Sequence, residues 1–132
     1  MGHTLDLRVY YEDTDLAGIV YYANYLKFIE RGRTEWLRGL GVDQSVLKEE
    51  TGQVFAVRRV EADYLRPARL DDRLQVRTAV SEIGTARITM SQQVFRGDEL
   101  LFQAQVTIVC LAAGGRPARI PANIRAVMGG EG

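Results

Sequence analysis

The densest group of chemically active side chains is a short acidic run near the N-terminus. It reads Tyr10-Tyr11-Glu12-Asp13-Thr14-Asp15-Leu16-Ala17-Gly18 and lies between a strand-like stretch and the start of a predicted helix. Carboxylates in such a place can act as a nucleophile, a general base, ligands of a hard cation, or caps of the following helix. The first turn of that helix adds free N–H donors and a partial positive charge, which suit an oxyanion.

Three interpretations of this run compete on the residues alone. A calcium loop would place Asp13, Asp15 and Gly18 at its first, third and sixth positions. Ala17 and Asn24 then stand where a further ligand and a bidentate glutamate are required, which argues against calcium. An aspartyl-phosphate hydrolase also has Asp-x-Asp after a strand, but it needs a much longer doubly wound domain. The third interpretation is an acidic turn that only caps the helix, and composition alone favours it.

The elements that must position these groups follow from hydrophobic periodicity. Apolar and polar residues alternate over residues 5–11, which predicts a strand with one buried face. Residues 24–40 repeat apolar side chains at helical spacing, and Asn24 is the expected N-cap. Gly32 falls on the apolar face of this helix, where a glycine makes sense if a sheet packs closely against it.

The second half of the chain is predicted to be mostly strand. Apolar and polar residues alternate in four runs, at residues 54–64, 74–80, 88–94 and 100–111. The turns between these runs are short, which favours an antiparallel meander. Residues 42–50 are a short second helix or an irregular linker. Glycine and proline predict that the segment from Ala112 onward is a loose wrap ending in disorder. The whole predicts one α+β domain over residues 1–132, with a core of about residues 5–111 and a tail of residues 112–132.

Composition limits the available chemistry and partners. The chain has 132 residues, of which 46% are hydrophobic, and its 17 basic and 17 acidic side chains cancel. This balance is typical of a soluble domain and favours neither nucleic acid nor a membrane surface as a partner. No apolar run is long enough to cross a membrane and no signal peptide is recognised, so we expect a cytoplasmic protein.

Cysteine and histidine are nearly absent. The single cysteine, Cys110, excludes an internal disulfide, and with one histidine, His3, no zinc site is expected. We expect Cys110 to be a buried strand residue, His3 to be disordered rather than catalytic, and Trp36 to belong to the core. Any chemistry must therefore rest on carboxylates, hydroxyls and backbone amides.

Two blocks of sequence resemble the hotdog-fold acyl-CoA thioesterases of the 4-hydroxybenzoyl-CoA thioesterase superfamily. The first runs from Val9 to Glu35 and the second from Ala62 to Asp72, within a similarity that spans about Leu7 to Pro121. Within that superfamily the chain is most similar to the branch associated with the bacterial Tol–Pal envelope operon. The resemblance implies a hotdog fold, an antiparallel five-stranded sheet wrapped around one long central helix.

The resemblance also implies roles for particular residues. Asp15 matches the catalytic carboxylate, which acts as nucleophile or as general base toward the thioester. The backbone N–H of Tyr22 matches the donor that polarises the thioester carbonyl, and Gly18 begins the turn into the helix. The Tol–Pal branch usually has histidine where Tyr22 stands, so a histidine proton shuttle does not carry over. Tyr11 either orients a water or packs.

The implied substrate is an acyl-CoA, with no metal and no cofactor beyond the coenzyme A of the substrate itself. The candidate substrate-binding residues are Tyr11, Asn24, Arg58, Arg59 and Arg87. The arginines are the candidates for the phosphates, although a solvated or ion-paired arginine is the simpler explanation for each. Relatives of this kind are homodimers or homotetramers with the active site between subunits, and we expect residues 54–64 to complete the neighbour's pocket.

The sequence therefore predicts an acyl-CoA thioesterase. The alternative is a non-catalytic hotdog module that binds an acyl carrier protein or cell-envelope assembly factors, and such a carrier protein is also a candidate partner of the enzyme. Asp15 argues against a pure binding module, because binding needs no acid beside a helix start. A dehydratase or isomerase relative usually needs a histidine in its site. Acyl length, and aromatic against aliphatic acyl groups, stay open.

Overall fold

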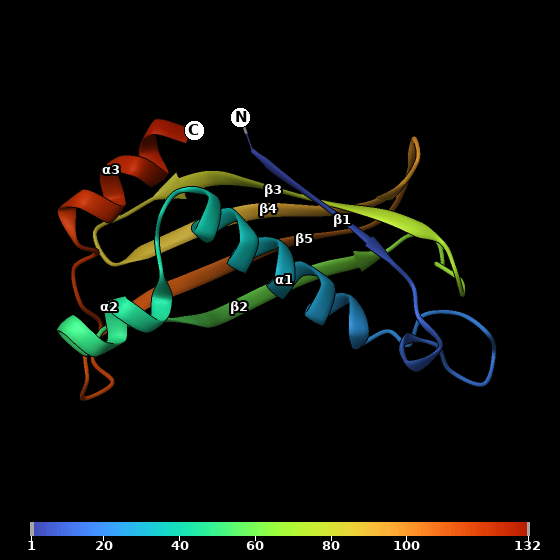
Figure 1. Ribbon diagram of the computed structural model, residues 1–132, viewed down its shortest axis with the longest axis horizontal. Helices are drawn as coiled ribbons and strands as arrows, with labels where there is room; N and C mark the ends of the chain where they lie inside the picture. Colours follow the sequence, from blue (N-terminus) through green and yellow to red (C-terminus); the bar gives the residue numbers. More distant parts are fainter. Residues whose placement is uncertain (1, 132) are drawn as a thin grey trace.

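One five-stranded antiparallel sheet carries a single long helix along one of its faces (Figure 1). The computed structural model describes residues 2–131, so Met1 and Gly132, the ends of the predicted domain, lie outside the described residues. The strands are β1 (His3–Arg8), β2 (Val54–Tyr64), β3 (Arg73–Ile83), β4 (Arg87–Arg96) and β5 (Glu99–Leu111). The helices are η1 (Tyr11–Asp13, a 3-10 turn), α1 (Asn24–Gly39), α2 (Gln44–Thr51) and α3 (Ala122–Glu131).

The sheet has the strand order β1-β3-β4-β5-β2. Strands β3, β4 and β5 form the predicted meander through short turns, and β2 pairs with β5 so that Tyr64 faces Phe102 at one end and Val54 faces Leu111 at the other. Strands β1 and β2 are the two edges. The α+β fold predicted from the sequence pattern and the hotdog resemblance is confirmed.

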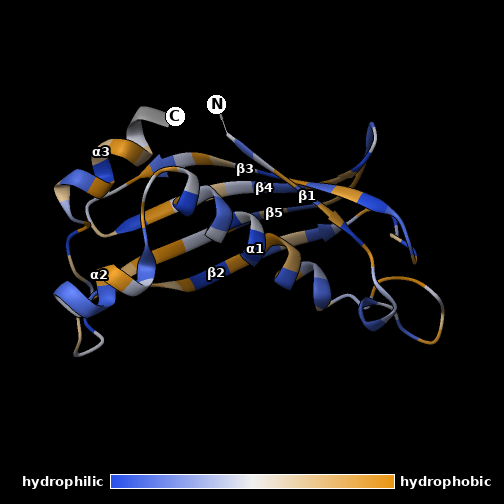
Figure 2. Ribbon diagram, in the orientation of Figure 1, coloured by the Kyte–Doolittle hydropathy of each residue, from blue (hydrophilic) through white to orange (hydrophobic). Residues whose placement is uncertain are grey.

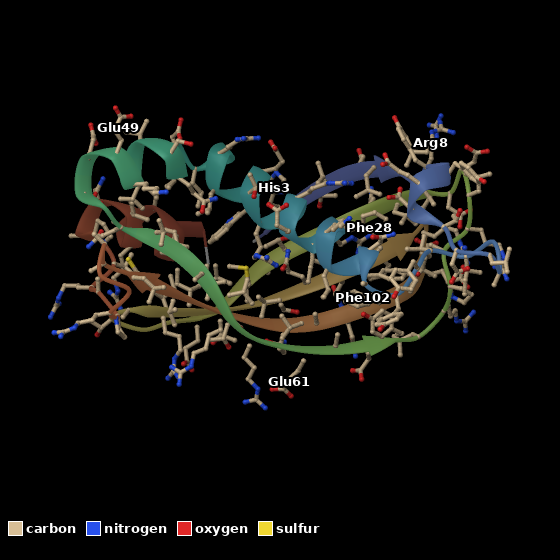
Figure 3. The ribbon with its side chains drawn as sticks, turned by 90° about the horizontal axis from the view of Figure 1, so that it is seen from below. His3, Arg8, Phe28, Glu49, Glu61 and Phe102 are labelled. Carbon is tan, nitrogen blue, oxygen red and sulfur yellow. The ribbon has the colours of Figure 1, made fainter. Side chains whose placement is uncertain are left out.

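The apolar face of α1 packs on β1, β3 and β4. Figure 3 shows Phe28 on α1 and Phe102 on β5 in the layer between helix and sheet, whereas Glu61 on β2 points away from the helix. Trp36 is 2% exposed, which confirms its predicted place in the core. Burial of this face is the main favourable contribution to folding, since each large apolar side chain contributes about 1.5–3 kcal/mol.

Helix α1 approaches the sheet closely at Gly32. A Cβ atom added there would lie 2.7 Å from Cγ1 of Val76 and 3.1 Å from Oγ1 of Thr78. The fully buried Gln92 of β4 uses this space, and its Nε2 donates to the Ile29 carbonyl of α1 (2.8 Å) and to Thr78 Oγ1 (2.9 Å). The glycine predicted to mark a close helix–sheet contact therefore does so, and a polar pair fixes the helix there.

Helix α1 leaves the edge strand β2 uncovered on the same side of the sheet. Val57, Val60 and Tyr64 are 48%, 37% and 47% exposed, although the register places them opposite the buried Ile108, Val106 and Phe102 of β5. Exposed apolar side chains beside an open strand edge are typical of a surface that a partner covers.

Two helices close the end of the sheet that lies away from the acidic run (Figure 1). The undecided segment 42–50 contains α2, which begins at the Asp43 cap and ends at Gly52 with a φ of 75°. The loose tail expected from Ala112 is wrong, because α3 packs near β3. Ile120, Ile124 and Met128 are buried at helical spacing, and Figure 2 shows both apolar and polar colours along this helix. None of the described helices combines the length and apolar character needed to cross a membrane.

The N-terminal strand also differs from expectation. It begins earlier, at His3, and ends at Arg8, because the chain turns into η1 at Tyr11. His3 pairs with Thr78 of β3, so the expectation that it is disordered is wrong. Cys110 is buried as expected, and burial raises the pKa of its thiol.

We expect Gly32→Ala to lower the free energy of unfolding by about 1–3 kcal/mol, because the new methyl group overpacks a buried β-branched neighbour. Gly39→Ala on the same helix is the matched control, since its nearest neighbour, His3 Cδ2, is 4.0 Å away. The control should be neutral or gain up to about 1 kcal/mol from helix propensity. Urea unfolding of both variants measures the difference, and equal effects would contradict the close contact.

Candidate active site

The acidic run folds into a 3-10 turn followed by a tight antiparallel loop. Asp13 is 8% exposed, and its Oδ2 accepts a hydrogen bond from the Tyr10 N–H at 2.8 Å, which fixes the turn. The Asp13 carbonyl accepts from the Tyr21 N–H at 2.9 Å, and Thr14 bridges Val20. Asp13 therefore has a structural role, which distinguishes it from Asp15, the second acid of the run Asp13-Thr14-Asp15.

Residues 13–15 and 19–21 pair as a small antiparallel ladder, and Asp15 lies at its closed end, beside the turn. Its N–H donates to the Ile19 carbonyl (2.9 Å), its carbonyl accepts from the Gly18 N–H (3.0 Å), and its Oδ1 accepts from the Ala17 N–H (2.9 Å). Gly18 has a φ of 79°, a conformation that glycine adopts without the cost a side chain adds, and this closes the turn as expected. The carboxylate is thus both oriented by the turn and exposed to solvent.

The other arm of the ladder runs directly into α1. The residue at the N-cap is Ala23, which supplies no side-chain cap, so the expected cap at Asn24 is wrong. Asn24 is instead the first helical residue, and its Nδ2 donates to the Asp13 carbonyl at 2.9 Å. Within the described residues 2–131, no acceptor is found for the backbone N–H of Tyr22. The helix start therefore presents a free donor at its positive end.

Aromatic rings hold this helix start against the sheet. The hydroxyl of Tyr64 on β2 donates to the Tyr22 carbonyl at 2.9 Å, and its ring lies 5.4 Å from that of Tyr25 and 5.0 Å from that of Phe102. Tyr25 stacks on Phe102 at 5.0 Å. Each ring pair adds about 0.5–1.5 kcal/mol to its apolar burial, so these rings anchor Tyr22 through its carbonyl, in the peptide that follows the one bearing its N–H.

Several effects raise the pKa of the Tyr21 phenol. The largest is a hydrogen bond with the Tyr22 side chain, and the smallest is the negative charge of Asp15. Burial raises the pKa of both Tyr25 and Tyr64, so these phenols stay neutral.

The predicted substrate-binding residues are only partly brought together. Tyr11 is 84% exposed on the acidic run, and Asn24 contacts that run, as described above. Arg58 and Arg59 lie on the exposed edge strand β2, where Arg59 pairs with Glu61 at 3.1 Å. Arg87 of β4 pairs with Val109 of β5, which in turn pairs with Ala56 of β2. Ala56 lies eight residues, and so roughly 26 Å, along β2 from Tyr64. Within one chain Arg87 thus lies far from Tyr64, and the role of all three arginines stays a prediction.

Periodicity and spacing did not reveal two of the residues that shape the site. Tyr64 falls in the second block of the family resemblance, where the sequence predicts only that it belongs to a strand. For Tyr25 the sequence predicts only a place on the apolar face of the helix. No local signal distinguishes them, because their contacts join β2, α1 and β5. Among residues 2–131, no three His, Cys, Asp or Glu side chains are grouped as the ligands of a metal ion would be.

Comparison with known proteins identifies the family. The model of the thioesterase superfamily matches residues 17–103 of the chain. The chain belongs to this superfamily. It is 43% identical over 126 residues to an acyl-CoA thioesterase, YbgC, of Haemophilus influenzae, with 95% of this chain and 93% of that protein covered. The Escherichia coli O157:H7 acyl-CoA thioester hydrolase YbgC is 41% identical, over 80% of this chain and 78% of that one. The predicted family is confirmed.

Solved structures show the same fold both at substantial and at low sequence identity to this chain. A probable thioesterase from Bartonella henselae has a TM-score of 0.88 and 39% identity, covering 92% of this chain and all of that one. A 1,4-dihydroxy-2-naphthoyl-CoA thioesterase from Synechocystis has a TM-score of 0.90 at 23% identity, covering 97% of this chain and 96% of that one. At that lower identity the likeness concerns the fold.

Proposed function

We propose that the protein hydrolyses the thioester of an acyl-CoA to the free acid and coenzyme A. Membership of the thioesterase superfamily and the acyl-CoA thioesterases among its relatives support this class. One observation carries the assignment to residues. A single hydrogen-bonded ladder bears the exposed Asp15 carboxylate at its turn and the free Tyr22 N–H where it enters α1.

In the proposed reaction the Tyr22 N–H donates to the thioester oxygen. Negative charge develops on that oxygen as the tetrahedral intermediate forms, and the free amide at the positive end of α1 stabilises it. Removal of one such donor typically costs about 3 kcal/mol of transition-state stabilisation. The carbonyl of the peptide that bears this N–H, that of Tyr21, accepts from the Asn24 N–H at 2.8 Å, and the Tyr64 hydroxyl holds the next peptide, so the donor is oriented before the substrate arrives.

Asp15 supplies the second group, and two balanced routes use it. As a general base it takes a proton from water while the water oxygen bonds to the carbonyl carbon. The carbon–sulfur bond then breaks and the thiolate of coenzyme A takes up a proton. As a nucleophile, Asp15 bonds to the carbonyl carbon and expels the thiolate, and water then hydrolyses the resulting anhydride. The turn holds the carboxylate through Ala17 in either route.

We further propose that the active unit is a homodimer or a homotetramer in the cytoplasm, and that it needs no metal or separate cofactor. The open edge of β2 and the exposed Val57, Val60 and Tyr64 support pairing with a second copy. Two β2 strands paired antiparallel about a two-fold axis would place the start of one strand beside the Tyr64 end of the other.

We expect Asp15→Asn to lower kcat for acyl-CoA hydrolysis at least about 100-fold with little change in Tm, since general-base contributions alone are about 10²–10⁴. The asparagine amide oxygen can still accept from Ala17. A thiol-release assay over a panel of acyl-CoAs measures the rate. Asp13→Asn is the matched control and should lose far less activity, because it can keep the contact to Tyr10. Equal losses at both positions would mean that the run is only a cap.

Two substitutions at Tyr22 separate its backbone from its side chain. Tyr22→Phe should keep most activity, whereas Tyr22→Pro deletes the N–H near a helix start that tolerates proline and should lower kcat by about 10²–10³. Circular dichroism controls for folding of the proline variant. A folded, fully active proline variant would place the oxyanion donor elsewhere, and equal damage in both variants would make the phenol the functional group.

Assembly is tested by sedimentation velocity at micromolar protein concentration. We expect a mass of two or four chains, because the edge of β2 and its exposed apolar side chains are covered on association. A fully active monomer would contradict the proposal that the site is shared between subunits.

A further inference from the structure

The loop between β2 and β3 lies against the catalytic segment at both of that segment's ends. We call residues Arg66–Asp72 the clamp loop. Before the acidic run, Val9 exchanges two backbone hydrogen bonds with the loop, donating to the Asp72 carbonyl (2.9 Å) and accepting from the Asp71 N–H (3.0 Å). After the run, the Val20 N–H donates to the Ala68 carbonyl at 2.8 Å, and Ile19 bridges Arg69. The ends of the Asp15 segment are thus fixed by one loop.

The clamp loop also holds the start of α1. The Ala68 N–H donates to the hydroxyl of Tyr25 at 3.0 Å, and both residues are buried, at 0% and 3% exposure. Tyr25 lies one helical turn after Tyr22. The loop therefore connects the two groups on which the proposed reaction depends, the Asp15 carboxylate and the Tyr22 amide.

An ion-pair cluster at the end of β4 determines the shape of the clamp loop. Arg96 Nη1 donates to Asp72 Oδ2 (2.7 Å) and to the Pro67 carbonyl (3.3 Å), and Nη2 donates to Glu99 Oε1 (2.7 Å). Asp72 Oδ2 accepts in addition from the Arg69 N–H at 2.8 Å. The side chains of Arg96 and Asp72 are only 29% and 23% exposed, so their bonds are partly shielded from water.

The loop needs such external support. Apart from the buried Ala68 and the half-buried Asp72, its residues are exposed and contribute little apolar packing. Asp71 has a φ of 71°, a strained conformation for a residue with a side chain, which persists only where neighbouring contacts enforce it. The hydrogen bonds of Arg96 to Pro67 and Asp72 span the loop from its second residue to its last.

We infer that Arg96 and Asp72 are positioning residues of the active site. They fix the clamp loop, and through it the relative placement of Asp15 and the Tyr22 N–H. This inference rests on the proposed function for its kinetic consequence. It also assigns a role to the second block of the family resemblance, Ala62–Asp72, for which the proposed reaction has no other use beyond Tyr64.

A positioning role predicts a particular kinetic signature. A displacement of about 1 Å between reacting groups can cost about 10²-fold in rate. Arg96→Met should therefore lower kcat about 10–100-fold and change KM less than threefold, whereas Arg96→Lys, which keeps the charge, should recover part of kcat. Arg38→Met is the matched control, because it removes an exposed ion pair to Glu35 of the same 2.7 Å length at the far end of α1. It should leave kcat unchanged.

Two further measurements separate positioning from a general loss of stability. In the Asp15→Asn background, Arg96→Met should lower the residual rate less than threefold, because the placement of the carboxylate relative to the Tyr22 N–H no longer matters once the carboxylate is absent. Hydrogen–deuterium exchange of the Asp15 and Val20 amides should accelerate in Arg96→Met at a temperature well below Tm, while amides of the β3–β4 ladder keep their protection.

These outcomes decide the inference separately from the proposed function. Unchanged kcat in Arg96→Met, unchanged exchange at Val20, or a full additional loss in the Asp15→Asn background would each overturn it. If the wild-type protein cleaves no acyl-CoA, the proposed function fails, and the exchange experiment still decides whether Arg96 holds the acidic segment in place.

Discussion

The close contact between α1 and the sheet at Gly32 is the constraint on which the remaining structure depends. Without a side chain at this position, the helix descends until Val76 and Thr78 fill the gap, and Gln92 bonds to the helix carbonyl of Ile29. This contact fixes the height and register of α1 over β3 and β4. The start of the helix, and hence the direction of the free amide at Tyr22, follows from it.

From that fixed helix, the site is built outward by backbone hydrogen bonds. The ladder between residues 13–15 and 19–21 joins the acid to the helix start, and the clamp loop joins both to β4 through Arg96. The aromatic rings of α1, β2 and β5 and the half-buried ion pair between Arg96 and Asp72 are thus both connected to the same short segment, whose carboxylate lies at the surface.

The sequence predicted the parts of this arrangement whose causes are local. Hydrophobic spacing located α1 and the strands, and Gly32 on an apolar face indicated the close contact. Other features depend on distant residues. Arg96 and Asp72 are 24 positions apart and belong to no periodic pattern, so only the fold reveals their pairing. Near the C-terminus, prolines and glycines concealed the helical spacing of Ile120, Ile124 and Met128, and tertiary burial of these residues outweighed the weak local propensity.

The proposed use of a backbone amide as the oxyanion donor has a consequence for how such a protein can change over evolutionary time. A mutation replaces a side chain, but every residue except proline keeps its N–H. The phenol of Tyr22 is 63% exposed and stands beside the proposed reaction centre. Under this proposal the position is free to acquire different side chains, and with them different substrate preferences, while the proposed oxyanion donor is inherited unaltered.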